Sequence, residues 1–402
     1  MNDVARPAQA WEVDGDLTRR LERSFERVLG WVQAHNYRGY EPADGNSSIL
    51  FPLTGARVFP MRLLQQAVLR SPVNIRPVLG IRPHESAIGL GYMAWACVLM
   101  HRRTGAEAYG HEARKCFDWL MANRGEAGGE FAWGDPYEYA TRSGRRPKGT
   151  PMLIWSALIG QAFLDAFEEF GDARYRDVAE SVGRWVLNLP AERTPTGMCL
   201  SYVAFRQSSI HNANAMGAAL LARLGRLMSS ARHLEAAQDA MTYTCARQLP
   251  DGAWLYAEEP KYHWIDNFHT GYNLSALMVY RAATGDTSFD DQFVKAARYF
   301  VGTFFEPDGR PKYFHDRTYP VDIQCAAQAI ETLTALETFV PGSFALAQKV
   351  AAWTISNLQA PDGHFRYRHL GWMTVNTPML HWGQGTMAKA LAVALAALDA
   401  HA

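Results

Sequence analysis

The sequence predicts an all-α fold, an (α/α)6 toroid of six helical hairpins with long loops on one face, from two observations. The first is a Pro-x-Gly turn that recurs at nearly equal intervals, at Pro195, Pro250, Pro307 and Pro361. The second is that helical segments of two kinds alternate between these turns. Self-similarity at a fixed period is typical of stacked helical hairpins, and it outweighs any local motif in predicting a fold.

Segments of the first kind place apolar residues three and four positions apart among charged ones, as helices with one buried side do. We expect these outer helices over residues 107–123, 173–189, 231–248, 288–305 and 343–358. Segments of the second kind are rich in Ala, Gly, Leu and Met and nearly uncharged over their first turns, which indicates helices buried on most sides. We expect these inner helices over residues 84–103, 151–170, 212–228, 267–283, 322–336 and 377–398.

The two ends of the chain complete the count, because the inner helix over 377–398 has no outer partner after it. The amphipathic segment 17–33 supplies that partner and closes the ring. We therefore expect a single domain over residues 1–402. The segment 36–83 carries extra loop, with a short helix around 62–69.

Composition excludes several classes of function. The 40 Lys and Arg balance 40 Asp and Glu, and no block of like charge indicates a nucleic-acid or membrane partner. The five cysteines are odd in number and widely spaced, which suits buried thiols in a reducing compartment. No leader pattern precedes Asp16, and no run of eighteen apolar residues occurs. We expect a soluble, cytoplasmic protein without a transmembrane segment.

The loops predict where a site would lie. Turns from inner to outer helices are short, whereas the connections back to the inner helices are long and carry most of the unusual polar and aromatic residues. Long loops on one face of a rigid scaffold are where sites are usually built. All inner helices begin at this face, which we call the mouth face, with their free N–H groups directed towards it.

Seven residues near the mouth face are candidates for catalysis. Three histidines stand at or near the starts of inner helices, which favours a polar pocket, and a pair of carboxylates would serve cleavage of a glycosidic bond. The sequence leaves the pairing open. The candidates are Asp135, Glu138, His211, Asp266, His269, Tyr313 and Asp322.

A second group of residues is suited to binding a saccharide. Aromatic rings with polar edges pack against sugar rings, and loop arginines favour an anionic sugar such as a uronate. Each has a structural alternative, loop packing for the aromatics and helix capping for Asn376 and for Asp266 or Asn267. The candidates are Trp133, Tyr137, Tyr139, Arg142, Asn212, Asn214, Trp264, Asn267, His315, Arg317, Tyr319, Tyr367, Asn376, His381 and Trp382.

Metal and nucleotide sites have no support in the sequence. There is no His-Glu-x-x-His, no Cys-x-x-Cys, no phosphate-binding Gly-x-x-x-x-Gly-Lys and no strand-led Gly-x-Gly-x-x-Gly. We expect neither a metal nor a cofactor.

Two resemblances add to this interpretation. The run from Gln248 to Trp254 resembles the Q-x-x-D-G-x-W pattern of α/α-toroid terpenoid cyclases, and the run from Gln359 to Phe365 is a looser copy. In those cyclases the pattern is a structural brace, and similar turns occur in six-hairpin glycosidases and epimerases, so the resemblance implies a fold rather than a reaction. The Asp-x-Asp-Asp that protonates triterpenes is absent here.

The chain also resembles a group of bacterial six-hairpin proteins associated with exopolysaccharide biosynthesis. The resemblance runs through Gly39-Tyr40-Glu41, Trp133-Gly134-Asp135, His211-Asn212-Ala213-Asn214, Asp266-Asn267-Phe268-His269-Thr270-Gly271 and Ala326-Ala327-Gln328-Ala329. It implies the toroid fold and a saccharide ligand.

The function expected first is a carbohydrate-active enzyme that acts on a poly- or oligosaccharide by metal-independent acid/base chemistry. For hydrolysis, Asp135 or Glu138 would donate the proton and Asp266 or Asp322 would activate water. For elimination or epimerisation, His269 or His211 would act with a tyrosine such as Tyr313.

Two other classes remain open. One is a non-catalytic saccharide-binding or assembly protein on the same scaffold. The other is a terpenoid-cyclase-like enzyme, which predicts a mouth lined by aromatic residues without polar groups. Convergence of His269 and Asp266 in the mouth would count against the cyclase.

Overall fold

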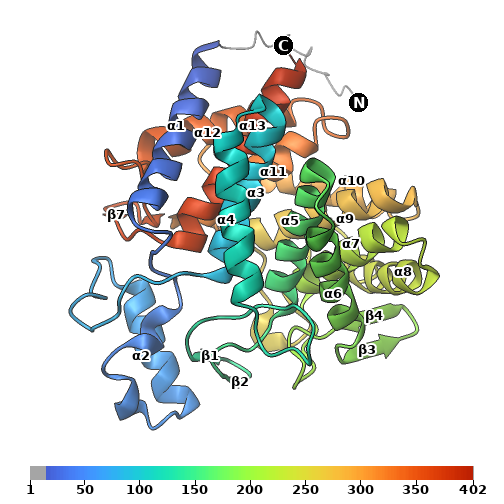
Figure 1. The fold of residues 1–402 in the computed structure, drawn as a ribbon, viewed down its shortest axis with the longest axis horizontal. Coiled ribbons are helices and arrows are strands. Elements are labelled where there is room, and N and C mark those ends of the chain that lie inside the picture. The colour runs from blue at the N-terminus through green and yellow to red at the C-terminus, as the bar shows by residue number, and fades with distance from the viewer. Residues whose placement is uncertain (1–14, 402) are drawn as a thin grey trace.

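The computed structural model describes residues 15–401. Residues 1–14, where the sequence shows no leader pattern, and residue 402 lie outside the described residues, so the expected domain limits are followed only between them. Within this part of the chain, helices dominate and short strands occur only in the loops (Figure 1).

Six inner helices form a closed ring in which each packs against the next and the last packs against the first. Their apolar, small-residue composition is explained by this position, because each has neighbours on most sides and is largely buried. They are α3 (Ala87–Thr104), α5 (Leu153–Phe170), α7 (His211–Leu227), α9 (Asn267–Thr284), α11 (Ile323–Ala335) and α13 (Thr386–His401).

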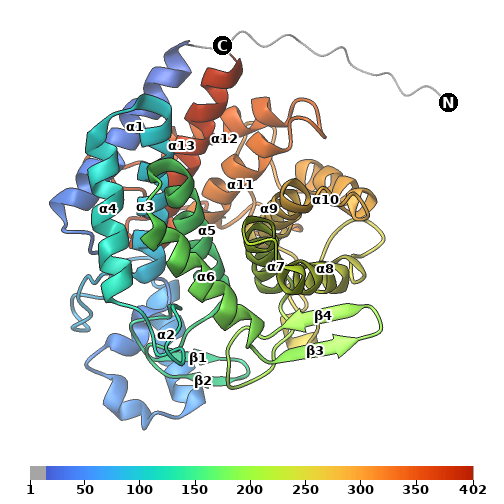
Figure 2. The same ribbon diagram turned by 45° about the vertical axis from the view of Figure 1, so that its right-hand side comes forward.

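Six amphipathic helices surround this ring. Five of them pack against the inner helix that precedes them, and the sixth, α1, packs against α13, so the N-terminal helix meets the last helix (Figures 1 and 2). The outer helices are α4 (Glu107–Ala122), α6 (Ala173–Leu187), α8 (Ala231–Cys245), α10 (Asp290–Thr303), α12 (Ser343–Leu358) and α1 (Gly15–Ala34).

The repeated turn glycines hold neighbouring outer helices together. Each has a positive φ, and each lies against the backbone of the next outer helix. A Cβ on Gly252 would lie 2.5 Å from the Lys295 carbonyl oxygen of α10, and a Cβ on Gly363 would lie 2.5 Å from the Arg27 carbonyl oxygen of α1. Only glycine allows this approach.

The glutamine of the Q-x-x-D-G pattern is a brace, as its resemblance implies. The Gln248 side-chain amide donates to the carbonyl oxygens of Gly252 at 3.1 Å and Gln292 of α10 at 2.8 Å. The Gln359 amide does the same towards Gly363 and Ser24 of α1, both at 3.0 Å. The turn therefore has a structural role.

Short antiparallel strands support the loops of the mouth face. β1 (Tyr139–Thr141) pairs with β2 (Gly144–Arg146), and β3 (Ala191–Thr194) pairs with β4 (Gly197–Leu200). A third sheet has the order β5 (Val321–Asp322), β6 (Arg368–His369), β7 (Thr374–Val375). The first and third sheets bring Arg146 and Arg368 back towards the carboxylates discussed below.

One expected helix is different in the structure. The segment 377–398 does not begin as an α-helix but contains a π-helix, η4 (Leu380–Gly385), before α13. Trp382 and Gly383 leave helical geometry, with φ 152° at Gly383. The Gln384 amide holds this conformation by donating to the carbonyl oxygens of Phe365 and Met379 and accepting from the Phe365 N–H.

The segment 36–83 forms an appendage beside the ring. It contains two 3-10 turns, η1 (Asp44–Ser47) and η2 (Phe51–Thr54), and the helix α2 (Val58–Arg70), which extends the short helix expected around 62–69. A further 3-10 turn, η3 (Pro260–Tyr262), lies in the loop before α9. Between residues 15 and 401, no helix has the length and apolar content needed to cross a membrane.

Candidate active site

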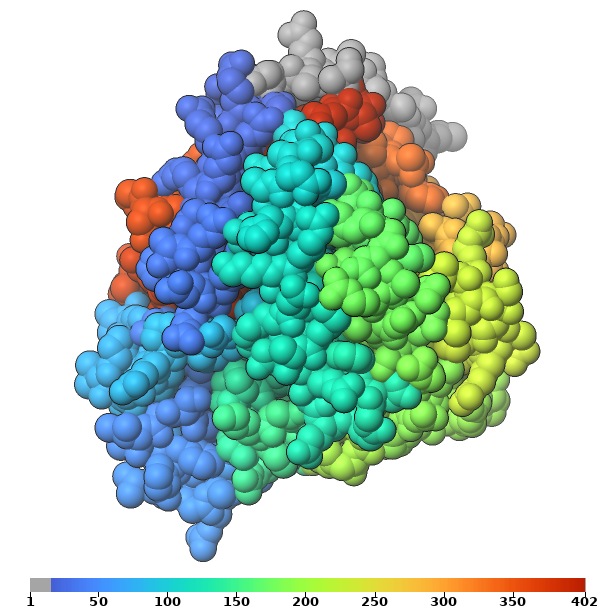
Figure 3. Space-filling model, viewed as in Figure 1, coloured from blue at the N-terminus to red at the C-terminus, as the bar shows by residue number. Residues whose placement is uncertain are grey.

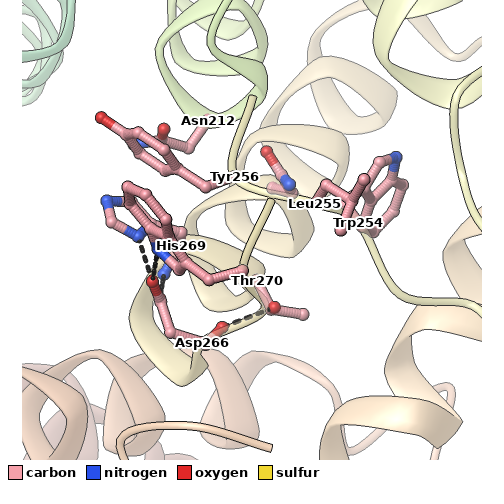
Figure 4. A pocket seen from close by; sticks show the side chains of 9 residues that line it. Asn212, Trp254, Leu255, Tyr256, Asp266, His269 and Thr270 are labelled. Carbon is pink, nitrogen blue, oxygen red and sulfur yellow. Dashed lines mark hydrogen bonds and ion pairs between the residues drawn. The ribbon is translucent and has the colours of Figure 1, made fainter. Parts of the chain in front are cut away.

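A histidine–carboxylate dyad lies at the start of α9. Asp266 is the N-cap, and its Oδ1 accepts from the backbone N–H of His269 at 3.0 Å. Its Oδ2 lies 2.6 Å from His269 Nδ1 and accepts from the Trp264 indole N–H at 2.9 Å (Figure 4). A carboxylate only accepts hydrogen bonds, so Nδ1 carries the proton and Nε2 of the neutral ring is the acceptor. Nε2 has no hydrogen-bond partner among the described residues.

A second dyad lies at the π-helix before α13. Glu41, only 1% exposed, accepts from the backbone N–H of His381 at 3.0 Å, and its other oxygen lies 3.6 Å from His381 Nδ1. The appendage delivers Glu41 because its chain pairs with the segment before the π-helix. The Tyr40 N–H donates to the Pro378 carbonyl oxygen at 3.1 Å, and the Leu380 N–H donates to the Tyr40 carbonyl oxygen at 2.8 Å.

Two glycines make room for the second dyad. A Cβ on Gly39 would lie 2.9 Å from the Cβ of Leu380, and a Cβ on Gly89 would lie 3.3 Å from the His381 backbone nitrogen. The π-helix thus packs closely against both the appendage and the first turn of α3. Any larger side chain at either position would displace Leu380, the residue before His381.

Aromatic rings connect the two dyads. The Phe268 ring is centred 3.9 Å from the His269 ring and 5.7 Å from the Trp382 ring, and the Trp382 ring is 6.5 Å from the His381 ring. On its other side, His381 stacks on Tyr92 with centroids 5.7 Å apart. A chain of ring contacts through Phe268 and Trp382 therefore joins the two histidines, with the Phe268 and Trp382 rings perpendicular to each other.

A small pocket opens beside the first dyad, between the starts of α7 and α9 (Figure 4). The side-chain Oδ1 atoms of Asn212 and Asn273 are buried there without hydrogen-bond partners. Such atoms are costly unless a ligand or water meets them. The pocket is lined by Asn212, Trp254, Leu255, Tyr256, Trp264, Asp266, His269, Thr270 and Asn273.

Asp135 forms a buried ion pair with Arg146 of β2. Burial raises the pKa of Asp135, and the charge and hydrogen bond of Arg146 oppose the shift. The charge of Glu41 raises the same pKa further and that of His381 lowers it, which places this ion pair next to the second dyad. Arg146 also lies over the Tyr139 ring, 4.2 Å from its centroid.

Asp322 is held in the same way. It caps α11 by accepting from the Gln324 N–H at 2.9 Å, and it is ion-paired with Arg368 of β6. Burial raises the pKa of Asp322, and the Arg368 charge opposes the shift. Arg368 lies over the rings of Tyr313 and Tyr367, at 5.4 and 4.5 Å.

Three predicted site residues have structural roles instead. Trp133 is buried in the core, where its indole N–H donates to the Leu120 carbonyl oxygen at 3.0 Å. The Asn214 amide is used entirely within the hairpin, by Leu200, Ala240 and Thr244.

His211 is the third, and it is 1% exposed. Its Nε2 lies 2.7 Å from Glu258, and the ring is 6.1 Å from that of Tyr243 in α8. The side chains of all three residues are buried and hydrogen-bonded within the protein, which favours a structural role over contact with a substrate.

Other predicted site residues differ in exposure and contacts. Glu138 is partly exposed and paired with Arg145 at 2.7 Å, and the hydrogen bond from Arg145 lowers the pKa of Glu138. Burial raises the pKa of Tyr137, and the charge of Asp135 raises it further. Asn267 is buried, and neither polar atom of its side chain has a hydrogen-bond partner. Exposed or partly exposed loop positions hold Arg142, His315, Arg317, Tyr319 and Asn376.

The sequence reasoning assigned no role to Glu41. A signal was present, since Glu41 and Asp44 are the only acidic residues between positions 36 and 84. Asp44 is paired with buried Arg76 at 2.8 Å, and Arg76 also donates to the Glu41 carbonyl oxygen at 3.0 Å. Because Arg76 uses the Asp44 carboxylate and the Glu41 carbonyl oxygen, the Glu41 carboxylate remains available to His381.

No protein-family model matches this sequence, and no curated protein matches it at a significant level. Solved structures are similar in fold. A sugar epimerase from a ruminal bacterium superposes with a TM-score of 0.59 at 11% identity, over 78% of this chain and 90% of its own. An unsaturated glucuronyl hydrolase specific for heparin superposes with a TM-score of 0.61 at 13% identity, over 94% of this chain and 96% of its own.

An inactive variant of an α-1,6-mannanase of Salegentibacter sp., in complex with α-1,6-mannotriose, superposes with a TM-score of 0.61 at 12% identity. The match covers 96% of this chain and 99% of the mannanase. The fold is an (α/α)6 toroid. The predicted fold class is therefore confirmed, and the two dyads lie on the face of the toroid where the inner helices begin. Among the described residues, no three potential ligands of the His, Cys, Asp or Glu type are grouped to hold a metal ion.

Proposed function

We propose that this protein is a carbohydrate-active enzyme that moves a proton at a sugar carbon next to a carbonyl or carboxylate group. The observation that carries the proposal is the presence of two dyads, His269–Asp266 and His381–Glu41, in the mouth of the toroid. In the first, the Asp266 carboxylate holds the His269 ring through Nδ1 at 2.6 Å. In the second, Glu41 binds the backbone N–H of His381 and lies 3.6 Å from Nδ1 of its ring. Neither Nε2 has a hydrogen-bond partner among residues 15–401. Histidine side chains serve as general acids and bases in enzymes.

Two histidines on either side of one substrate suit epimerisation. The neutral ring removes a proton from the carbon, and the electron pair moves into the adjacent carbonyl. The protonated ring of the other dyad then returns a proton to the opposite face of the carbon, and the configuration inverts. The carboxylates Asp266 and Glu41 stabilise each imidazolium as it forms. Elimination also uses a base and an acid, but its acid gives the proton to the leaving oxygen and not to the opposite face of the carbon.

Hydrolysis by a pair of carboxylates has weaker support. Asp135 and Asp322 are each held by an arginine, and Glu138 faces Arg145. Asp266 already accepts from three donors. A hydrolytic base needs an oxygen that is available to water. The terpenoid-cyclase alternative also loses support, because His269 and Asp266 converge among the aromatic residues.

The similar structures support a sugar as the substrate, since their names describe an epimerase, a hydrolase and a mannanase of saccharides. We extend the proposal to a cytoplasmic role in exopolysaccharide biosynthesis. The sequence resemblance supports that role, and the five free, buried cysteines suit a reducing compartment.

Hydrogen exchange with solvent tests the proposal. We expect a reducing or uronate-bearing oligosaccharide incubated with the protein in D2O to lose the proton signal of one sugar carbon in its NMR spectrum. His269→Ala and His381→Ala should each slow this exchange by roughly 10²–10⁴-fold, the usual contribution of a positioned acid or base. His111→Ala is the matched control, because His111 is exposed on α4.

Each other outcome selects a different chemistry. New reducing ends without exchange indicate hydrolysis, and products that absorb in the ultraviolet indicate elimination. Saccharide binding without any turnover contradicts the proposal of an enzyme and supports the non-catalytic alternative.

A further inference from the structure

Exposed apolar side chains are concentrated on the appendage. Leu53 is 83% exposed, Phe59 77% and Leu63 63%. Seven of the twelve large apolar side chains that are exposed in the described chain lie between residues 49 and 78. We call them the apolar patch: Ile49, Leu50, Leu53, Phe59, Leu63, Val73 and Val78. Figure 3 shows this part of the chain projecting from the rest of the molecule.

The exposure is built into the fold. The opposite side of α2 is buried through Met61, Gln65 and Val68. The Gln65 side-chain oxygen accepts from the Asn46 amide at 3.1 Å and from the Ala140 N–H of β1 at 3.2 Å. Because the inner side is fixed to the toroid, Phe59 and Leu63, four positions apart, are held outwards together.

The charge around the patch has one sign. Residues 45–84 contain five arginines and no Asp or Glu. Arg76 is buried against Asp44, but the other four are at least partly exposed, and none of them has a carboxylate partner among residues 15–401. These four are Arg57, Arg62, Arg70 and Arg82. The balanced charge of the whole chain indicated no membrane partner, but it hides this segment, which is locally cationic without any run of consecutive like charges.

We propose that the apolar patch and its four arginines dock this protein on an anionic lipid surface. Exposed leucine, isoleucine and phenylalanine side chains enter the boundary between headgroups and acyl chains, while arginines pair with lipid phosphates. A second copy of the chain fits less well. A symmetric contact through the same patch would bring both sets of arginines together without any acidic residue to offset them.

The position of the patch gives docking a consequence. The appendage is attached on the mouth face, where the Asn46 amide also donates to the Glu138 carbonyl oxygen at 3.1 Å. The appendage also contacts the second dyad. Arg76 pairs with Asp44 and donates to the Glu41 carbonyl oxygen, and the Glu41 carboxylate lies beside His381. A protein docked through the patch would therefore hold its mouth beside the lipid surface.

Vesicle sedimentation tests the docking surface. We expect the protein to sediment with vesicles that contain phosphatidylglycerol, much less with pure phosphatidylcholine, and less as salt rises. Each arginine near an anionic surface contributes about 1 kcal/mol, so Arg57→Gln with Arg70→Gln should weaken binding by at least about tenfold. Phe59→Ser with Leu63→Ser should weaken it by a similar factor or more, because both side chains would otherwise be buried in lipid.

Leu227→Ser is the matched control. Leu227 is 45% exposed at the far end of α7, away from the mouth face, so the substitution should leave vesicle binding unchanged. Size-exclusion chromatography with light scattering tests self-association. The proposal is overturned if the wild-type protein does not sediment with anionic vesicles, if the patch variants bind like wild type, or if the patch variants convert a dimer into a monomer. Sugar turnover in solution does not depend on the patch, so the two proposals fail separately.

Discussion

Gly252 shows how one residue sets the distance between two outer helices. Its φ is +98°, and a Cβ would meet the Lys295 carbonyl oxygen at 2.5 Å. Gly252→Ala should therefore reduce the free energy of unfolding by roughly 2–4 kcal/mol through backbone strain and overpacking. Chemical denaturation measures the change.

Gly30→Ala is the control for this prediction. Gly30 lies within α1, and a Cβ there would have nothing within 4 Å. The same substitution should stabilise the protein by roughly 0.5–1 kcal/mol, because alanine favours the helix. Equal effects at the two positions would contradict the role we give to the turn.

The residues of the first dyad could be predicted because they are local. Asp266 stands before an apolar helix, and a residue three positions later on a helix faces its N-cap. Glu41 could not be assigned in this way. It meets His381 across 340 positions, and that meeting depends on the backbone pairing of residues 40 and 380.

Side-chain direction limited the prediction for the other residues. Trp133 and Asn214 stand in the same stretches as residues of the candidate site, but in the folded chain their side chains are buried. Sequence periodicity is weak in loops and at the first turn of a helix that is buried on all sides. Such positions are distinguished only when the neighbouring helices are in place.

At the scale of elements, the loop after α4 is tied to α6 through Glu130. The carboxylate accepts from Arg184 at 3.0 Å and from the Ser181 hydroxyl at 2.6 Å. The hydrogen bond from Arg184 is the main reason that the pKa of Glu130 lies below its ordinary value. The folded protein thus binds this proton less readily than the unfolded chain, so the stabilisation is full above the ordinary glutamate pKa of about 4.3 and is lost as the pH falls through the lower, folded pKa.

Glu130→Gln should therefore lower the free energy of unfolding at neutral pH by at most about 1 kcal/mol, since Arg184 is half-exposed and screened by solvent. The difference from wild type should shrink in acid. Denaturation at neutral and acid pH measures it, with Glu126→Gln as control, because Glu126 is exposed in the same loop. A difference that grows in acid would contradict the pairing.

The π-helix could not be predicted from the sequence. Residues 380–385 keep the apolar character of an inner helix, so the pattern predicts a continuous helix over 377–398. The helix is broken at Trp382 and Gly383 because the Gln384 side-chain amide makes three hydrogen bonds to the backbone of Phe365 and Met379. π-helical insertions are frequent at functional sites, and this one carries His381.

At the scale of the whole molecule, the expectation of one domain becomes a question of cooperativity. Phe25 of α1 is fully buried, with its ring 5.7 Å from that of Tyr109 in α4, and Phe163 of α5 is equally buried. If the ring unfolds as one unit, Phe25→Ala and Phe163→Ala should each reduce its stability by roughly 3–5 kcal/mol.

Thermal unfolding followed by circular dichroism checks this expectation. We expect a single transition in both variants, at a lower temperature than in wild type. Arg19→Ala, an exposed change on α1, should leave the transition within about 0.5 kcal/mol of wild type. A separate early transition in Phe25→Ala alone would show that α1 is peripheral to the ring.

The appendage marks the limit of prediction at this scale. The sequence indicates a short helix there, but it does not show which leucines of α2 face the toroid and which face solvent. The buried side is decided by Gln65 and Met61, which pack towards η1 and β1. The apolar patch is visible only once that side is known.

Closure of the ring by α1 and α13 also sets an order of events during synthesis. α1 is made before α13, and residues 35–385 are translated between them. At about 5–20 residues per second, the apolar stripe of α1 waits roughly 20–70 s for its main partner to leave the ribosome. The hairpins from α3 to α12 can pair with their neighbours as they emerge, whereas α1 at first meets α4, through Phe25 and Tyr109, and lacks its main partner. A nascent chain of this protein therefore keeps part of the apolar stripe of α1 uncovered until α13 has been made, and a chaperone would hold side chains such as Leu21 and Val28.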